Sequence, residues 1–298
     1  MKFTIKMKIT NHLTRFSSGG LMAAVLFMAS CQDDEKRLTV QDTQDISEEA
    51  LTDSYYQDVD DMGSVAIGTP SDTDLSGGRK AATITIDDDR FGCDGVVITI
   101  TPDAGSTADI PKGKITVDFG TLGCKDAKGN VRKGKIIFSY YKRRFQPGST
   151  VVATTENYYI NGIKLEGVRT STNVTGSTED APRFNVVLTN GKATFADGSV
   201  ATRESDITWS WERGASASLD KLVIDKVSTA SGTTRGGRTY EVSLTEDLIY
   251  NRTCFLALDG VKRYIIDGSK EIVIDYGVGD CNTISVTVNG ITRSLNVN

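Results

Sequence analysis

The chain is nearly devoid of histidine. Its single histidine, His12, lies among the first 30 residues, which are argued below to be removed. Ser-His-Asp and Cys-His catalytic units need an imidazole, and zinc and copper sites usually include one. Asp87-Asp88-Asp89 lacks the ligand spacing of a twelve-residue calcium loop. We therefore expect no histidine-dependent catalysis, no cofactor and no metal site.

An excess of basic charge is also missing. The chain has 34 basic and 39 acidic residues, and residues 81–298 carry 26 of each sign. Residues 31–80 hold 13 acidic and four basic residues. Nucleic-acid binding needs a basic face, and the short basic run Lys142-Arg143-Arg144 is typical of a solvated turn. We expect no nucleic-acid partner.

The amino-terminal segment lacks an apolar run long enough to cross a bilayer. Leu21–Ser30 contains ten residues, whereas a membrane-spanning helix needs roughly 20. Basic residues precede this run and small residues end it, which is typical of a secretory signal. Met28-Ala29-Ser30-Cys31 resembles the lipobox of bacterial lipoproteins, whose cysteine becomes the acylated first residue. The resemblance implies a signal peptide at 1–30 and a diacyl or triacyl anchor, including palmitate, at Cys31.

The residues behind the cysteine resemble a localisation signal. Gln32-Asp33-Asp34-Glu35 is similar to the acidic signal that sends lipoproteins of Bacteroidetes to the outer face of the outer membrane. This resemblance implies an outer-membrane protein that faces the cell exterior, with the membrane as a partner through its lipid. An anchor facing the periplasm is the alternative.

Residues 31–80 are expected to form an acidic tether. The stretch is rich in Ser, Thr, Asp and Gly. Asp45-Ile46-Ser47-Glu48 is typical of a helix N-cap, and apolar residues recur at roughly helical spacing as far as Met62. The sequence therefore predicts one short helix at 46–62, with Gly63 directly behind it, inside a spacer that holds the body off the membrane.

Residues 81–298 are expected to form an all-β domain. Apolar and polar residues alternate, as in Val97-Ile98-Thr99-Ile100, and Asn-Gly or Asp-Gly pairs begin at 161, 190, 197, 259, 267 and 289. Such pairs suit two-residue hairpin turns. The pattern predicts an antiparallel meander of roughly 14 to 16 strands, folded as a sandwich or a long curled sheet. Two lobes are an alternative to a single domain.

The cysteines behind Cys31 are even in number, which favours disulfides in an exported protein. Ile115–Cys124 matches Ile272–Cys281, and in each copy another cysteine stands about thirty residues earlier, at 93 or 254. A strand that returns antiparallel would bring the two ends of each copy together. The sequence therefore predicts Cys93 paired with Cys124 and Cys254 paired with Cys281, each worth about 3 kcal/mol.

The body resembles a group of Bacteroidetes surface lipoproteins with no established activity. The resemblance rests on Ile115–Cys124, Tyr158-Tyr159-Ile160-Asn161-Gly162, Trp209–Gly214 and Ile274-Asp275-Tyr276-Gly277. It implies an all-β fold and an outer-membrane address, and it implies no reaction.

Two residue pairs are candidate sites. Trp209 and Trp211 lie two apart and so share one face of a strand; exposed, they would form a platform for a sugar or a protein, and buried, they belong to the core. Asp118 and Asp275 hold equivalent places in the two matching segments. They could converge as an acid/base pair of the kind used in glycoside hydrolysis, or each could cap the turn behind its strand.

These observations favour a non-enzymatic lipoprotein that acts as a binding or envelope-structural module for an unknown protein or glycan. The alternative is a carboxylate-dependent hydrolase of extracellular glycans, which needs the two aspartates close together.

Overall fold

The computed structural model describes residues 37–75, 81–93, 95–174, 181–215, 220–251, 257–278 and 283–296. The signal peptide, Cys31, Cys254 and Cys281 lie outside these ranges. Two helices, α1 (Val40–Gly68) and α2 (Asp72–Leu75), precede the strands. Within the described ranges, no helix combines the length and apolarity needed to cross a bilayer.

Seventeen strands follow the helices in the described ranges. They are β1 (Ala82–Ile84), β2 (Val97–Pro102), β3 (Lys112–Asp118), β4 (Cys124–Lys125), β5 (Val131–Tyr141), β6 (Thr150–Ile160), β7 (Ile163–Asn173), β8 (Arg183–Thr194), β9 (Val200–Glu212), β10 (Lys221–Ile224), β11 (Thr229–Thr233), β12 (Thr239–Leu244), β13 (Leu248–Tyr250), β14 (Asp259–Ile266), β15 (Lys270–Val278), β16 (Thr283–Val288) and β17 (Ile291–Asn296).

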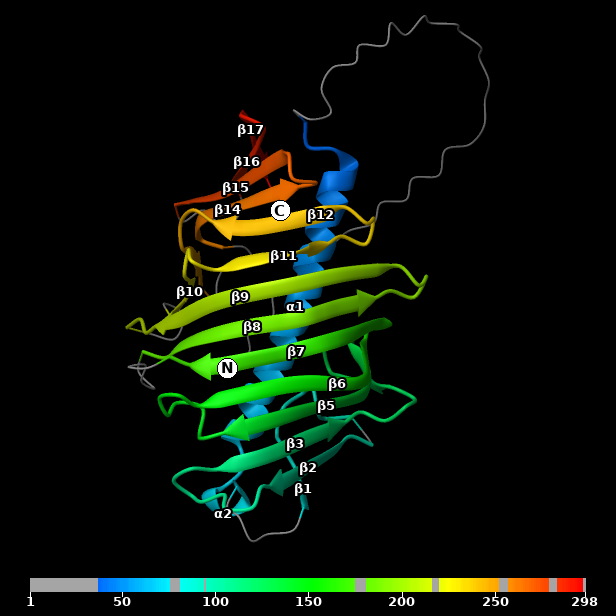
Figure 1. Ribbon diagram of the computed structural model, residues 1–298, viewed down its shortest axis with the longest axis vertical. Helices are drawn as coiled ribbons and strands as arrows, with labels where there is room; N and C mark the ends of the chain where they lie inside the picture. The colour runs from blue at the N-terminus through cyan, green and yellow to red at the C-terminus, as the bar shows by residue number, and fades with distance from the viewer. Residues whose placement is uncertain are drawn as a thin grey trace, which may run out of the picture.

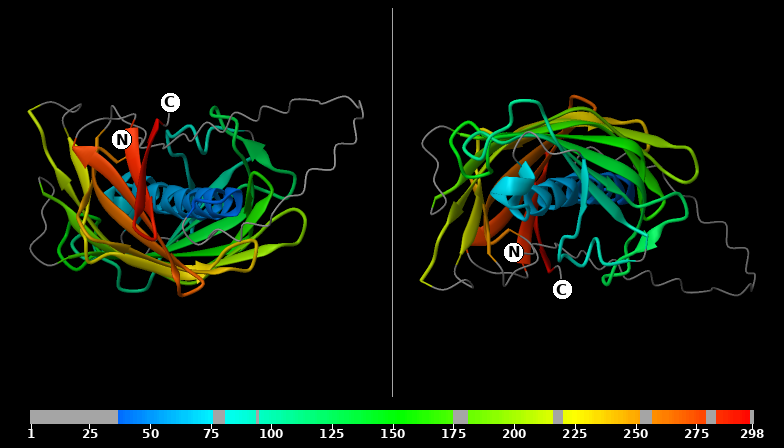
Figure 2. Two further views of the ribbon diagram at one scale, coloured as in Figure 1. Left: turned by 90° about the horizontal axis from the view of Figure 1, so that it is seen from above. Right: turned by 90° about the horizontal axis from the view of Figure 1, so that it is seen from below.

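The strands form one antiparallel sheet, which confirms the predicted all-β meander. Neighbours in sequence pair from β1 to β3 and from β5 to β9, and β3 also pairs with β5. The start of β9 pairs with β11, and its end pairs with β10. Two pairs of short strands, β11–β12 and β10–β13, therefore lie side by side between β9 and β14, and both β12 and β13 pair with β14. Of the two predicted forms, the sheet takes the curled one, and α1 lies along its concave side (Figures 1 and 2).

Three of the predicted Asn-Gly and Asp-Gly turns join neighbouring strands. Asn161, Asp267 and Asn289 have φ angles of 52°, 50° and 42°, and the glycine behind each is also positive, as a type I′ hairpin requires. The pairs at 190 and 259 instead lie at register shifts within β8 and β14. There the glycine allows a bulge, so the same dipeptide serves two local structures.

The acidic stretch is not a spacer over its whole length, and this corrects the predicted tether at 31–80. Helix α1 begins six residues earlier and ends six residues later than the predicted helix at 46–62. It begins at a capping box, in which the Thr39 side chain accepts from the Asp42 N–H and the Asp42 carboxylate accepts from the Thr39 N–H. The helix continues through Gly63 because that glycine packs on Phe138: a Cβ there would lie 2.8 Å from the ring.

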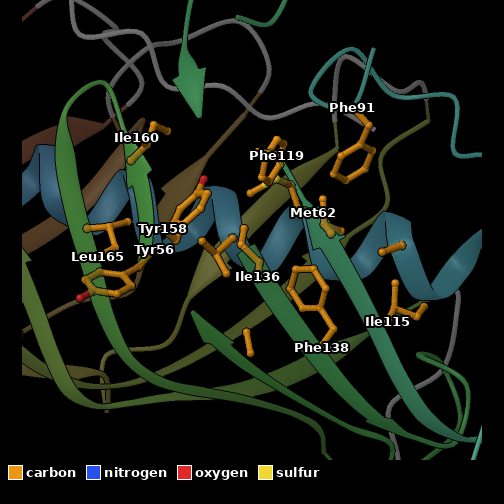
Figure 3. Close-up of a cluster of buried hydrophobic side chains, with 14 of the residues drawn as sticks. Tyr56, Met62, Phe91, Ile115, Phe119, Ile136, Phe138, Tyr158, Ile160 and Leu165 are labelled. Carbon is orange, nitrogen blue, oxygen red and sulfur yellow. The ribbon is translucent and has the colours of Figure 1, made fainter. Parts of the chain in front are cut away.

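The carboxyl-terminal half of α1 packs into an apolar core. Tyr56, Val59 and Met62 are buried beside side chains of the inner face of the sheet (Figure 3). Phe138 and Leu165 are among the sheet residues that are fully buried there. The Tyr56 hydroxyl also donates to the Glu166 carbonyl at 2.7 Å. This half of the helix is therefore the second layer that a one-sided sheet needs.

The amino-terminal half of α1 instead meets the sheet through ion pairs. Asp42 bonds to Lys270 at 2.5 Å and to Arg238 at 2.9 Å. Glu49 bonds to Arg203, to Lys262 at 3.3 Å and to the Tyr264 hydroxyl at 2.9 Å. Both carboxylates are buried. The acidic residues that were expected in solvent thus face cations on the concave side.

A second apolar cluster lies among β11, β12, β14, β15 and β16, and Leu38 and Ile46 pack against it. The two clusters correspond to the two halves of the body, which one continuous sheet joins and α1 spans. Cys93 and Cys124 form the predicted disulfide beside the first cluster, with Cα atoms 5.8 Å apart. The predicted Cys254–Cys281 pair lies outside the described residues.

We predict that Glu49→Gln lowers the free energy of unfolding by about 3 kcal/mol, because it leaves Arg203 and Lys262 buried with less compensating charge. Burial alone would raise the pKa of Glu49, but Lys262 and Arg203 lower it to about 2, so the side chain is ionised at neutral pH. The measurement is the midpoint of urea unfolding. Glu241→Gln, at an exposed position on β12, is the control. Equal midpoints for the two variants would contradict the role of Glu49.

Candidate functional site

A hollow opens between the carboxyl-terminal half of α1 and strands β5 to β8. Asp60 and Gly63 line it from the helix, Phe138 and Ser171 from the sheet, and Arg144 from the turn between β5 and β6. Phe184, at the start of β8, closes the apolar side. The cavity volume of the hollow is about 20 Å³, which leaves room for one small polar group.

Arg144 is held in place by its backbone. Ser149 Oγ and Asn173 Nδ2 donate to its carbonyl at 2.7 and 2.8 Å, and both donors are buried. Its guanidinium lies 5.2 Å from the Phe184 ring centre and 5.5 Å from that of Phe145, within the range of cation–π attraction. Burial lowers the pKa of Arg144, which still remains charged at neutral pH.

Two carboxylates of α1 act on this cation. Asp60 accepts from Arg169 Nε at 2.5 Å, and burial raises the pKa of Asp60 although Arg169 opposes the shift. Burial also raises the pKa of Asp61, to about 6, and the neighbouring charge of Asp60 adds to the shift. Arg144 opposes it. Asp61 therefore changes charge within the range where most side-chain carboxylates stay ionised.

The predicted tryptophan platform is part of this aromatic cluster. Trp209 lies opposite Phe184 in the β8–β9 register, and their rings stack with centroids 4.8 Å apart. Trp211, two residues on, is half-buried beside Arg213. The two tryptophans share the inner face, as the sequence predicts. One Trp209 face is used in stacking, however, so the pair is not a flat open platform.

The structure does not bring Asp118 and Asp275 together. Asp118 ends β3 and Asp275 lies on β15, and neither strand pairs with a neighbour of the other. The Asp118 carboxylate accepts from the Gly120 N–H at 2.9 Å, and the Asp275 carboxylate accepts from the Gly277 N–H at 2.8 Å. Each carboxylate thus binds a backbone N–H two residues ahead, Asp118 in the turn behind β3 and Asp275 inside β15, so both have a local role rather than a shared one.

Of the acidic run at 87–89, Asp88 forms an ion pair, and Asp87 and Asp89 are exposed. Asp88 is buried and accepts from Arg90 Nε at 2.9 Å, rather than lying in a solvated turn. Over the ranges that the structure describes, no three side chains of the metal-binding types gather into a group.

Sequence reasoning missed Arg144, Phe145 and Phe184. The first was assigned to a solvated turn as part of Lys142-Arg143-Arg144, and the two phenylalanines lie in unrelated segments. The alternation of Phe184, Val186 and Leu188 places Phe184 on the buried face of its strand. Nothing in the sequence, however, shows that the turn at 144 folds back over that face.

Comparison of the chain with protein-family models, with curated proteins and with solved structures finds no match. The functional argument therefore rests on the residues and their geometry.

We predict that Phe184→Ala destabilises the protein by about 3–5 kcal/mol, because the ring is buried and three neighbours pack on it. Phe145→Ala is the matched control: the same substitution at a ring that is 36 % exposed should cost roughly 1 kcal/mol. Urea unfolding followed by tryptophan fluorescence measures both. A smaller loss at 184 than at 145 would show that the cluster does not depend on Phe184.

Proposed function

We propose that the protein is an exported lipoprotein, anchored in the outer membrane through lipid on Cys31 and facing the cell exterior. In this proposal it acts without catalysis, as a binding or envelope-structural module. The observation that carries the proposal is the Met28-Ala29-Ser30-Cys31 segment, a lipobox at the end of a short apolar run behind basic residues. The acidic residues that follow support the outward orientation.

The Cys93–Cys124 disulfide supports the export step. Disulfides persist in oxidising compartments and are rare in the cytosol. The bond closes a segment of 31 residues around β2 and β3, so it contributes about 3–4 kcal/mol in the chain-entropy model.

The position of α1 changes how the body would be anchored. The capping box at Thr39 leaves only residues 32–38 between the acylated cysteine and the fold. Seven residues span at most about 25 Å when fully extended. The proposed anchor is therefore a short linker that holds the body near the membrane. It replaces the spacer of nearly fifty residues that the sequence predicted at 31–80.

The hydrolase alternative is not carried further, because each of its two aspartates has a local role rather than a shared one. The binding role is favoured by the hollow at Arg144, where polar and aromatic side chains converge on the concave face.

We predict that Cys31→Ala moves the protein from the membrane fraction to the soluble periplasm or the medium, with the body still folded. The measurement is fractionation, followed by circular dichroism of the released protein. Cys93→Ala is the control, because it changes a cysteine that carries no proposed lipid and should leave the protein in the membrane. Continued membrane retention of the Cys31 variant would contradict a lipid anchor. Protease treatment of intact cells tests the orientation, and protection of the wild-type body would refute the outward-facing form.

A further inference from the structure

The hollow at Arg144 contains hydrogen-bonding groups without partners. Among the described residues, the Arg144 guanidinium lies against the rings of Phe145 and Phe184 and has no hydrogen-bond acceptor, while Asp60 and Asp61 act on it through their charge. Arg169 is buried, and its second terminal nitrogen, Nη1, also has no partner there. Buried polar groups are satisfied in the great majority of native structures, by protein, water or a bound molecule. Arg169 Nη1 is one of six buried side-chain atoms without a partner among the described residues, whereas Arg144 is half-buried and lines the hollow, so an acceptor that enters the hollow can reach its free donors.

The unpaired state of Arg144 stands out against the rest of the concave face. Arg132 bonds to Asp58 at 2.7 Å, and Arg203 bonds to Asp53 at 2.9 Å. In both pairs the carboxylate comes from α1. Asp60 is the α1 carboxylate that lines the hollow, and it is already paired with Arg169. Among the described residues, Arg144 therefore has cation–π contacts with Phe145 and Phe184 but no carboxylate that accepts its hydrogen bonds.

We propose that this hollow binds a carboxylate-bearing ligand, with Arg144 as its principal partner. Guanidinium and carboxylate match as a two-bond fork, which is stronger and more directional than bonding to a neutral hydroxyl. The Ser171 hydroxyl lines the same hollow and can donate a further bond. Phe184 lines the apolar side of the hollow, and Phe145, which is exposed beside Arg144, can meet the part of the ligand that stays outside it.

The charges around the hollow favour an anion over a neutral ligand. Asp58, Asp60 and Asp61 on α1 face Arg90, Arg144 and Arg169 from the sheet side. Arg90 and Asp58 already have the partners Asp88 and Arg132, so protonation of Asp61 removes one of the two α1 carboxylates that act on Arg144. When Asp61 is ionised, it competes with a ligand for the field of Arg144. Binding should therefore weaken as the pH rises through about 6, the pKa to which burial raises Asp61.

This inference rests on the binding role proposed above and narrows it to one chemistry. It is tested on the full chain purified in detergent, where attachment to a membrane is not measured. A failure here would leave the anchor proposal standing, and membrane retention of Cys31→Ala protein, which would overturn the anchor, would leave this proposal standing.

The experiment is isothermal titration calorimetry with three probes at pH 5.5 and pH 8. Glucuronate carries a carboxylate on a sugar, glucose is its neutral counterpart, and acetate is a carboxylate without a sugar. We expect glucuronate to bind and glucose to give no heat of binding. Acetate binding as tightly as glucuronate would assign the site to small carboxylates, and weaker acetate binding would assign it to acidic sugars. Equal binding of glucose and glucuronate, or no binding by any probe, would overturn the proposal.

Variants separate the site from general effects on the fold. Arg144→Gln should weaken glucuronate binding about a hundredfold, as expected when one partner of a charged pair is removed. Arg183→Gln is the matched control, because Arg183 lies one residue before Phe184 on the opposite face and pairs with Asp225 at 2.7 Å. Its affinity should equal that of the wild type. Equal loss in both variants would refute the assignment.

Two further variants keep the test valid if Arg144→Gln does not fold. Arg144→Lys keeps the charge but not the fork, and should bind more weakly than the wild type. Asp61→Asn imitates the protonated carboxyl, so it should bind glucuronate about tenfold more tightly than the wild type at pH 8. Its affinity should also be the same at pH 5.5 and pH 8. A wild-type affinity that is independent of pH would contradict the role of Asp61.

Discussion

The fold depends on the match between the acidic face of α1 and the cations on the concave side of the sheet. A single curled sheet with one buried face needs a second layer, and α1 is that layer. Its first half meets the sheet through carboxylates such as Asp42 and Glu49. Its second half meets the sheet through apolar residues such as Met62, together with the ion pairs of Asp58 and Asp60. Buried ion pairs add little net stability, but an unmatched buried charge is costly. We infer that the pairs fix the position of the helix along the trough, while the apolar half supplies most of the binding free energy.

The sequence predicted the sheet much better than the helix. Strand alternation and hairpin dipeptides are local signals, and they lead directly to the antiparallel meander and to the Cys93–Cys124 pairing. The choice between sandwich and curled sheet depends on what covers the inner face, which no single strand records. Asp42, Asp45 and Glu49 recur at helical spacing in the same stripe as Tyr56 and Val59. Three of the ten buried residues of α1 are acidic, and all three lie in its amino-terminal half, so apolar periodicity predicted the helix only over 46–62 and missed its buried acidic face.

The neutral charge balance of the body likewise gave no sign that its cations face the acidic helix. Residues 81–298 are neutral as a whole, which correctly removes any argument for a broad basic surface. The average conceals an arrangement in which Arg203, Arg238 and Lys262 point into the trough toward α1. The acidic stretch and the neutral body are therefore two sides of one interface. A count of charges by segment treats the acidic stretch and the body separately, and their ion pairs are visible only in the three-dimensional structure.

At the candidate site, one cation that faces α1 has no carboxylate partner among the described residues. Inward cations along α1 have carboxylate partners, and the exception at Arg144 comes from a turn whose backbone is fixed by Ser149 and Asn173. The Arg144 guanidinium packs on the Phe184 ring, but no helical carboxylate among the described residues accepts its hydrogen-bond donors. Departures from local consistency are expected at functional sites, where the cost is offset by what the site binds. The same logic explains why the sequence could not reveal it: the Lys142-Arg143-Arg144 run is ordinary, and the missing partner is visible only in the fold.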